Sequence, residues 1–440
     1  MSSPSQSGSG FGGAIASSGF KRLLAGQAVS SLGDWVATLA FIAAAFALSH
    51  GNQTAVAVVL VLRLVPPIFA APVGGVLADR LSRRTIMVAC DISRAALIAV
   101  VPFVNLPSLY VIAFVHESIS LFFLPARDAS IPGLVPEGSL EQANGLILAS
   151  SYGSIPLAAA LFGGLRLVAS HVPGGVPFAH MFQDHPTSFA FFFDSATFLF
   201  SASMIAGLHL EQKRTEQHAE LLSDILEGFR YVMGHPALRA MAYGLVVSMF
   251  GGGVLFAVGI GYVRQTLGGS DVAFGWLAAL WGGGMGIGLA VVRLLVKERG
   301  SAPTFITAVA LCGGVLIFMA FVPVLWLAFV AAVVFGAVFS VAIVLALTLA
   351  QQTAEDRIRG RIMGGVQMLF RVGLGVGALG IGALAHSIRH LDVGVSLDGN
   401  QVGLIAGGIL ILLGAIASSS VAREGVWSGT KNPGAARSSA

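Results

Sequence analysis

The chain has 440 residues, of which 55% are hydrophobic and only 10% are charged, and its mean hydropathy is +0.84. A soluble protein carries about 25% charged residues on its wet surface, so this composition excludes a soluble globular protein. The net charge of +4 is not gathered on a soluble domain, and no nucleic-acid partner is predicted. Cys90 and Cys312 lie in apolar runs, which indicates two buried thiols without a disulfide or a metal.

The apolar runs long enough to cross a bilayer predict the architecture. Runs of about 18 residues or more indicate transmembrane helices. We therefore predict an all-α polytopic membrane protein with twelve transmembrane helices, over residues 23–48, 54–78, 84–104, 108–127, 141–169, 188–208, 239–263, 272–296, 303–322, 324–350, 362–386 and 402–421.

A polar stretch divides these spans into two halves that repeat each other weakly, as in transporters built from paired bundles. The predicted organisation is a disordered tail over 1–20, a six-helix bundle over 21–208, a linker over 209–238, a second six-helix bundle over 239–422 and a tail over 423–440. The linker fits either an amphipathic helix on the membrane surface or a plain soluble tether.

The basic residues predict the orientation. Nineteen of the 25 fall on one side of the predicted helices and three on the other, namely Arg166, Arg264 and Arg389. Because Lys and Arg concentrate in cytoplasmic loops, both termini and the linker are predicted to be cytoplasmic. The uncharged first 20 residues lack the basic start of a secretory signal, so we expect a multi-pass protein of the cytoplasmic membrane.

Several motifs resemble the major facilitator superfamily, and in particular its drug- and siderophore-exporting branch, which includes enterobactin exporters and macrolide-type efflux permeases. The segment GGVLADRLSRR (residues 74–84) is similar to the superfamily signature between the second and third spans. Further matches are GQAVSSLGDW in the first span, LPARDASIPGLVPEGSLEQANGL after the fourth, FGWLAALWGGGMGIG in the eighth and RGRIMGGVQ entering the eleventh.

This resemblance implies roles for particular residues. It implies that Asp79 and neighbouring residues clamp helix ends together in one state of a transport cycle; the inner-gate set is Gly75, Asp79, Arg80, Arg83 and Arg84. The arginines also suit simple anchoring at an anionic membrane surface. The chain departs from the proton antiporters in having Glu117 where the fourth span often has arginine. It keeps Pro156 of their fifth-span signature without the neighbouring glycines.

Six ionisable residues stand out well inside the predicted spans, where such groups are costly and usually functional: Asp34, Arg63, Asp91, Arg94, Glu117 and Arg371. Asp34 and Arg63 both come out roughly 16 Å above the inner face by helical rise, and Glu117 lies near that level. These three residues are the predicted coupling and substrate cavity, where a carboxylate binds a proton or another cation; the alternative is structural pairing.

The other intramembrane charges receive more local interpretations. Asp91 and Arg94 are three residues apart and can pair on one helix. Asp194, near the outer end of the sixth span, is interpreted as interfacial. The second half has Arg371 alone well inside a span, among apolar helices whose phenylalanines suit either an amphiphilic substrate or plain packing: Phe250, Phe256, Phe335 and Phe339.

The predicted function is secondary active export of a small amphiphilic compound across the cytoplasmic membrane by alternating access, with a proton as the expected coupling ion. The alternatives are a lysophospholipid transporter or flippase of the same fold and a non-transporting membrane sensor. We find no phosphate loop and no HExxH zinc motif at His116. We therefore predict no catalytic residue, metal or cofactor, and only substrate, coupling ion and lipids as partners.

Overall fold

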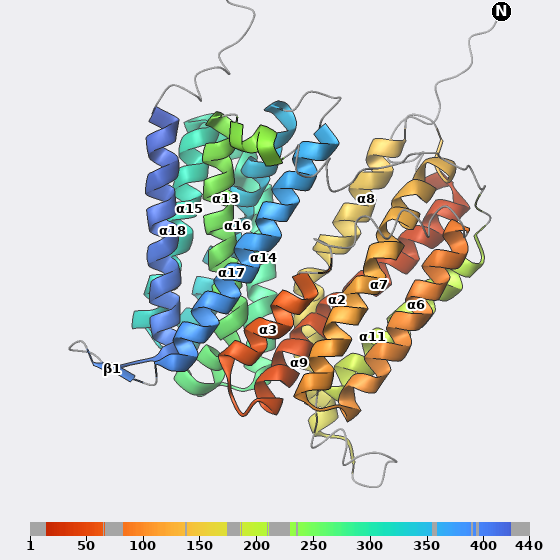
Figure 1. Ribbon diagram of the computed structural model, residues 1–440, viewed down its shortest axis with the longest axis horizontal. Coiled ribbons are helices and arrows are strands. Elements are labelled where there is room, and N and C mark those ends of the chain that lie inside the picture. Colours follow the sequence, from red (N-terminus) through yellow and green to blue (C-terminus); the bar gives the residue numbers. More distant parts are fainter. Residues whose placement is uncertain are drawn as a thin grey trace, which may run out of the picture.

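The structure, a computed structural model, is built almost wholly of helices that run side by side in two groups (Figure 1). It describes residues 15–64, 66, 82–136, 139–173, 185, 187–208, 210, 229–234, 236–353, 359–388, 390–392 and 396–423. Most of both predicted tails, most of the predicted 209–238 linker, and Gly75, Asp79 and Arg80 lie outside these ranges. Of the predicted 1–20 tail, residues 15–20 are described, and residues 18–20 form the start of helix α2 (Ser18–Leu48).

The N-terminal group surrounds one long central helix. It comprises α2 (Ser18–Leu48), α3 (Gln53–Leu64), α6 (Arg83–Val100) with η1 (Val101–Phe103), α7 (Leu106–Ser130) with η2 (Ile131–Gly133), α8 (Leu140–Gly153), α9 (Ile155–Ser170) and α11 (Ser188–Ala206). Ser17, Ser82 and Asn105 cap helix starts by accepting a hydrogen bond from the N–H three residues on. Helix α2 contacts α3, α7, α8, α9 and α11, so its side chains reach most of the group.

The C-terminal group has the same architecture. It comprises α13 (Pro236–Gly261) with the π-helical turn η3 (Tyr262–Thr266), α14 (Asp271–Arg299), α15 (Ser301–Phe321), α16 (Leu325–Thr353), α17 (Arg359–Ser387) and α18 (Gly399–Arg423). The main packing pairs are α14 with α16, α13 with α17 and α15 with α18.

The described helices fit a membrane protein. Nine of them are long and apolar enough to span a bilayer within the described residues, and the shorter apolar helices Gln53–Leu64 and Leu157–Ala169 add to these. Each of the twelve spans predicted from hydropathy coincides with at least one described helix. The predicted all-α polytopic fold is therefore confirmed.

The fifth span differs from its prediction as one helix. The chain forms two helices there, α8 and α9, with Ser154 between them. Pro156, the second residue of α9, has no N–H and cannot bond to the carbonyl of Tyr152. The break follows from this missing hydrogen bond, which a hydropathy scan does not register.

A second difference is a pair of short strands after α17. β1 (His390–Asp392) pairs antiparallel with β2 (Ser396–Asp398), with Leu391 opposite Leu397. This hairpin lies on the face where α17 ends and α18 begins, which we call the hairpin face (Figure 1). We call the opposite face, where α2 begins and α18 ends, the terminal face.

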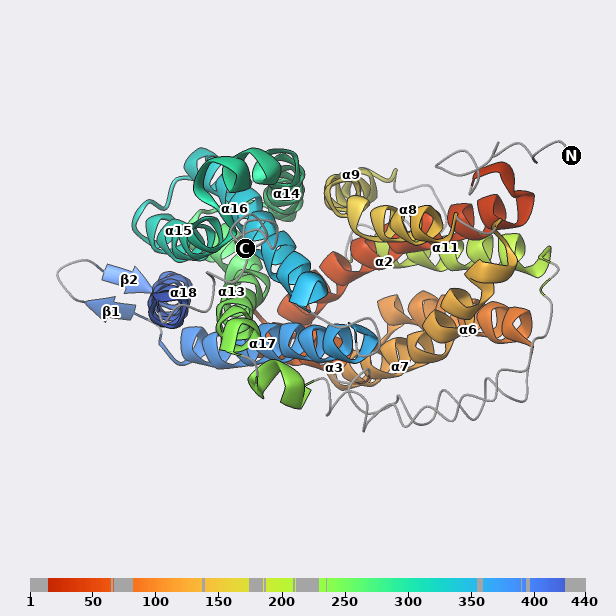
Figure 2. The ribbon, with the colours of Figure 1, turned by 90° about the horizontal axis from the view of Figure 1, so that it is seen from above.

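The two groups lie together toward the hairpin face and diverge toward the terminal face (Figures 1 and 2). Contacts between them are made mainly by α9 with α14 and by α3 with α17. Gly275 of α14 approaches the backbone of Gly163 of α9 so closely that a Cβ atom would lie 2.9 Å from its Cα. Glycine at this crossing therefore lets two helices of different groups touch.

Candidate functional site

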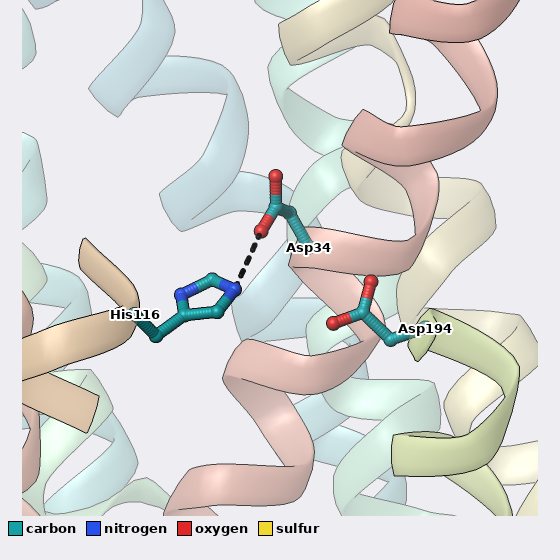
Figure 3. Close-up of side chains that lie close together, drawn as sticks. All are labelled: Asp34, His116 and Asp194. Carbon is teal, nitrogen blue, oxygen red and sulfur yellow. Dashed lines mark ion pairs between the residues drawn. The ribbon is translucent and has the colours of Figure 1, made fainter. Parts of the chain in front are cut away.

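Three ionisable side chains from different helices converge in the N-terminal group. Asp34 comes from α2, His116 from α7 and Asp194 from α11 (Figure 3). The Nε2 atom of His116 lies 3.9 Å from Oδ1 of Asp34, and one ligand atom from each residue lies within 4.8 Å of the others. His116 and Asp194 have no exposed surface, whereas the Asp34 side chain is 33% exposed. The cluster is thus buried on one side and open at Asp34.

A glycine allows this convergence. A Cβ atom at Gly33 would clash with Thr197 Oγ1 and Asp194 Oδ1. Because glycine has none, α11 can press its polar residues against α2. The Thr197 hydroxyl donates to the Asp194 carbonyl at 2.7 Å and lies 3.2 Å from its Oδ1, while Oδ2 of Asp194 has no hydrogen-bond partner.

Asp194 corrects a prediction, because it is fully buried in the bundle rather than interfacial. It lies about 6 residues inside α11, or roughly 9 Å by helical rise, and this depth is the sequence signal that could have placed it. The HExxH motif requires ligands that are close together in the sequence. His116 lies beside Asp34 and Asp194, which belong to other helices, so such a motif could not reveal the cluster.

The structure places the other predicted cavity residues beside this cluster. The Arg63 guanidinium lies 5.1 Å from the centre of the Phe41 ring, and its Nη1 is buried without a hydrogen-bond partner. Glu117 follows His116 on α7 and is half-buried. The cations near Glu117 include Arg63 of α3 and Arg371. Arg371 belongs to α17, so Glu117 experiences a cation of the opposite group.

Asp91 and Arg94 form a buried ion pair on α6, with side-chain exposures of 0% and 5%. The guanidinium carbon of Arg94 lies 4.6 Å from the Phe123 ring centre and 4.3 Å from that of Phe198. Two rings and a carboxylate thus replace the water that this charge would otherwise need. The two opposite charges thus compensate each other on α6, beside the cluster.

At the terminal face, arginines bind the carboxyl ends of helices. Arg83 Nη1 donates to the Ala129 carbonyl of α7 at 2.6 Å. Beyond the end of α11, Arg22 Nη1 donates to the Gly207 carbonyl at 3.0 Å and Arg84 Nη1 to the Leu208 carbonyl at 3.5 Å. Cations there satisfy orphan carbonyls and oppose the negative end of the helix dipole. The rest of the predicted inner-gate set lies outside the described residues.

An apolar pocket lies where α2 meets α13 and α14, lined by Leu39, Gly252, Leu255, Phe256, Phe274, Leu277, Ala278 and Trp281. Phe335 and Phe339, by contrast, are buried and stacked at 5.7 Å, so these two pack within the C-terminal group. Leu39 is five residues from Asp34 on α2, or roughly 7.5 Å along the helix. Five residues also turn the side chain by about 140° around the helix axis, so the ionisable cluster and the apolar pocket share α2 but lie on different sides of it.

On the hairpin face, an amide network joins the two groups. Gln53 Nε2 of α3 donates to Gln265 Oε1 at 3.0 Å and to Asn400 Oδ1 at 2.9 Å. Asn400 Nδ2 donates to Gln265 Oε1 at 3.1 Å. Gln53 and Asn400 are 5% and 2% exposed. We call these three residues the amide latch.

The amide latch predicts a conformational effect. Gln53→Ala removes the two hydrogen bonds that Gln53 makes to Gln265 and Asn400, each worth about 0.5–1.5 kcal/mol. We expect the population open at the hairpin face to rise about tenfold, since about 1.4 kcal/mol is a factor of ten. Spin labels at Leu48→Cys and Ser387→Cys, one on each group, report the distance. Thr54→Ala is the matched control, and an unchanged distance distribution in Gln53→Ala would contradict the latch.

The two groups of helices meet at one face and diverge at the other, and ionisable side chains are buried among the helices of the N-terminal group. This arrangement is typical of a multi-pass membrane transporter. The model of the Major Facilitator Superfamily matches residues 23–378, and the chain belongs to this family. This membership and the fold point to a transporter rather than an enzyme.

Relatives and solved structures agree with this assignment. The chain is 32% identical over 277 residues to the uncharacterized MFS-type transporter YfiS of Bacillus subtilis (strain 168), a match that covers 61% of this chain and 62% of YfiS, less than two thirds of that relative. It is 23% identical over 341 residues to the uncharacterized MFS-type transporter YkuC of the same organism, covering 72% of this chain and 74% of YkuC.

Among solved structures, a bacterial homologue of the human lysosomal transporter Spinster, inward-facing and unoccupied, superposes with a TM-score of 0.71 at 15% identity and covers 94% of this chain and 98% of that one. The nucleoside transporter NupG superposes with a TM-score of 0.69 at 13% identity and covers 92% of this chain and 99% of that one. At these identities the likeness concerns the fold alone.

Proposed function

We propose that the protein exports a small amphiphilic compound across the cytoplasmic membrane, driven by the inward movement of a cation, in the first place a proton. The observation that carries this proposal is the position of Asp34 and the apolar pocket on neighbouring stretches of α2. The partly exposed carboxylate suits the cation or a polar group of the substrate, and the pocket suits its apolar part. The resemblance of several sequence motifs to those of drug and siderophore exporters supports export as the direction of transport.

Transport into inverted membrane vesicles tests this function. We expect accumulation of amphiphilic cations or aromatic metabolites from a panel when an inward-acidic gradient is imposed, and its loss when the gradient is dissipated. Vesicles without the protein are the control. Movement of lysophospholipid between leaflets, with no transport of the panel, would contradict export and favour the lipid-handling alternative.

We also propose that the terminal face is cytoplasmic, which makes the described conformation inward-open. The arginines at this face and the excess of basic residues on its side support the proposal. Cysteine labelling tests it, because the native Cys90 and Cys312 are buried. In intact cells, an impermeant thiol reagent should not label Ser223→Cys in the linker but should label Ser387→Cys at the hairpin face. The reverse pattern would overturn the orientation.

A further inference from the structure

Two carboxylates of the cluster lack a basic partner. Within the part of the chain that the structure describes, neither Asp34 nor Asp194 forms an ion pair with a lysine or an arginine, and the ion-pair partner of Asp34 is His116. Of the two nearby cations, Arg94 is already paired with Asp91, and Arg63 of α3 lies near the cluster without forming an ion pair with it. Two like charges in a poorly solvated site repel each other, so the cluster calls for compensating positive charge.

His116 adds an unused ligand atom to these carboxylates. The ring is fully buried, and neither of its nitrogens has a hydrogen-bond partner. Its Nε2 points at Oδ1 of Asp34 (Figure 3), and Asp194 Oδ2 is also buried and unpartnered. Buried polar atoms are ordinarily satisfied. The histidine nitrogen and the carboxylate oxygens lie close together and could coordinate one metal ion.

We propose that Asp34, His116 and Asp194 bind one divalent transition-metal ion of the zinc and manganese class. The proposal rests on the cation-binding role proposed above for Asp34, and it adds a divalent ion to the proton as a cation that this site binds. Imidazole nitrogen with carboxylate oxygen is a ligand set that such ions accept, whereas magnesium and calcium prefer oxygen alone. One doubly charged ion neutralises both carboxylates at once.

The geometry permits this coordination after a small contraction. Zinc binds nitrogen and oxygen ligands at about 2.0–2.2 Å, which places tetrahedral ligand atoms roughly 3.4 Å apart. The three atoms now lie within 4.8 Å of one another, so the widest pair must close by at most about 1.4 Å. Protein ligands approach from three helices, and the partly exposed side of Asp34 leaves a position for water or a substrate atom, as in open zinc sites.

Other charges near the cluster offset one another in part. The positive ones are Arg63 of α3, Arg94 of α6 and Arg371 of α17, and the negative ones are Asp91 of α6 and Glu117 of α7. Arg94 is held by Asp91, and both Arg63 and Arg371 act on Glu117. Arg63 and Arg94 also act on Asp34 and Asp194. Together with these two carboxylates the acids still exceed the three arginines by one charge, so the cluster attracts a cation.

Calorimetry on the purified full-length chain tests the site without any transport. After chelator treatment and removal of any histidine tag, titration with zinc chloride should show one ion bound per chain, and magnesium should not compete. His116→Ala and Asp194→Asn should each weaken zinc binding at least about tenfold. Losing a residue that only supports a metal ligand already costs about 10–100-fold in affinity, and these two variants remove a ligand itself. His171→Ala, an exposed histidine on α9's end, is the matched control and should leave this affinity unchanged.

A second measurement guards against misfolded variants. X-ray absorption of the zinc-loaded chain should show nitrogen and oxygen neighbours at about 2.0 Å without sulfur, and His116→Gln should lose this signal while keeping its elution volume. Absence of stoichiometric zinc, or equal affinity in His116→Ala, would overturn the metal site and indicate that protons neutralise the carboxylates. Zinc binding by a chain that transports nothing would instead overturn the proposed function alone.

Discussion

Asp34→Asn should abolish cation-driven accumulation of substrate while substrate exchange across the membrane persists. The amide keeps the shape of the side chain but carries no negative charge, so a cation that binds at Asp34 loses its principal attraction. Exchange needs only the substrate pocket and the movement of the two helical groups. We expect the driven rate to fall at least about tenfold, the factor that corresponds to about 1.4 kcal/mol of lost cation binding.

Uptake into inverted vesicles under an imposed gradient measures the first rate, and counterflow of preloaded substrate measures the second. Protein amounts are matched by blotting. Glu298→Gln, which makes the same change at an exposed acid near the end of α14, is the control and should transport like the parent. Parental driven rates in Asp34→Asn would mean that this carboxylate has only a structural role. Glu117→Gln, measured in parallel, then decides whether the second predicted acid binds the cation.

Asp91→Asn should strongly destabilise the N-terminal group. Arg94 would keep its position between Phe123 and Phe198, but its charge would lose its carboxylate partner. Breaking a buried ion pair from one side costs about 3–5 kcal/mol. The midpoint of unfolding by sodium dodecyl sulfate in mixed micelles should therefore fall clearly. Ser93→Ala, an exposed position on the same helix, should leave the midpoint almost unchanged.

The double variant Asp91→Asn with Arg94→Leu separates charge from packing. Leucine removes the unpaired charge and still fills apolar space between the two rings, so most of the lost stability should return. If the single and double variants unfold at the same midpoint, the packing of Arg94 against its aromatic neighbours contributes more stability than its ion pair with Asp91.

The sequence by itself was sufficient for the membrane-spanning architecture. Apolar runs placed each helix because a bilayer imposes a length and a polarity on every segment that crosses it. The spacing of Asp91 and Arg94 likewise predicted their pairing, since residues three apart share one face of a helix. Hydropathy does not register the missing N–H of Pro156, so it predicted one helix where the chain forms two.

Only the tertiary structure decided which charges meet. Asp34, His116 and Asp194 lie on three helices and are far apart in the chain, and their convergence depends on Gly33 letting α11 approach α2. The amide latch likewise joins Gln53 to Asn400 across 347 positions. Helical rise gives the depth of a residue, but it does not give the rotation of one helix against its neighbours. That rotation is set by the packing of the whole bundle, which is why the sequence gives a predicted depth for Asp34 but not its partners.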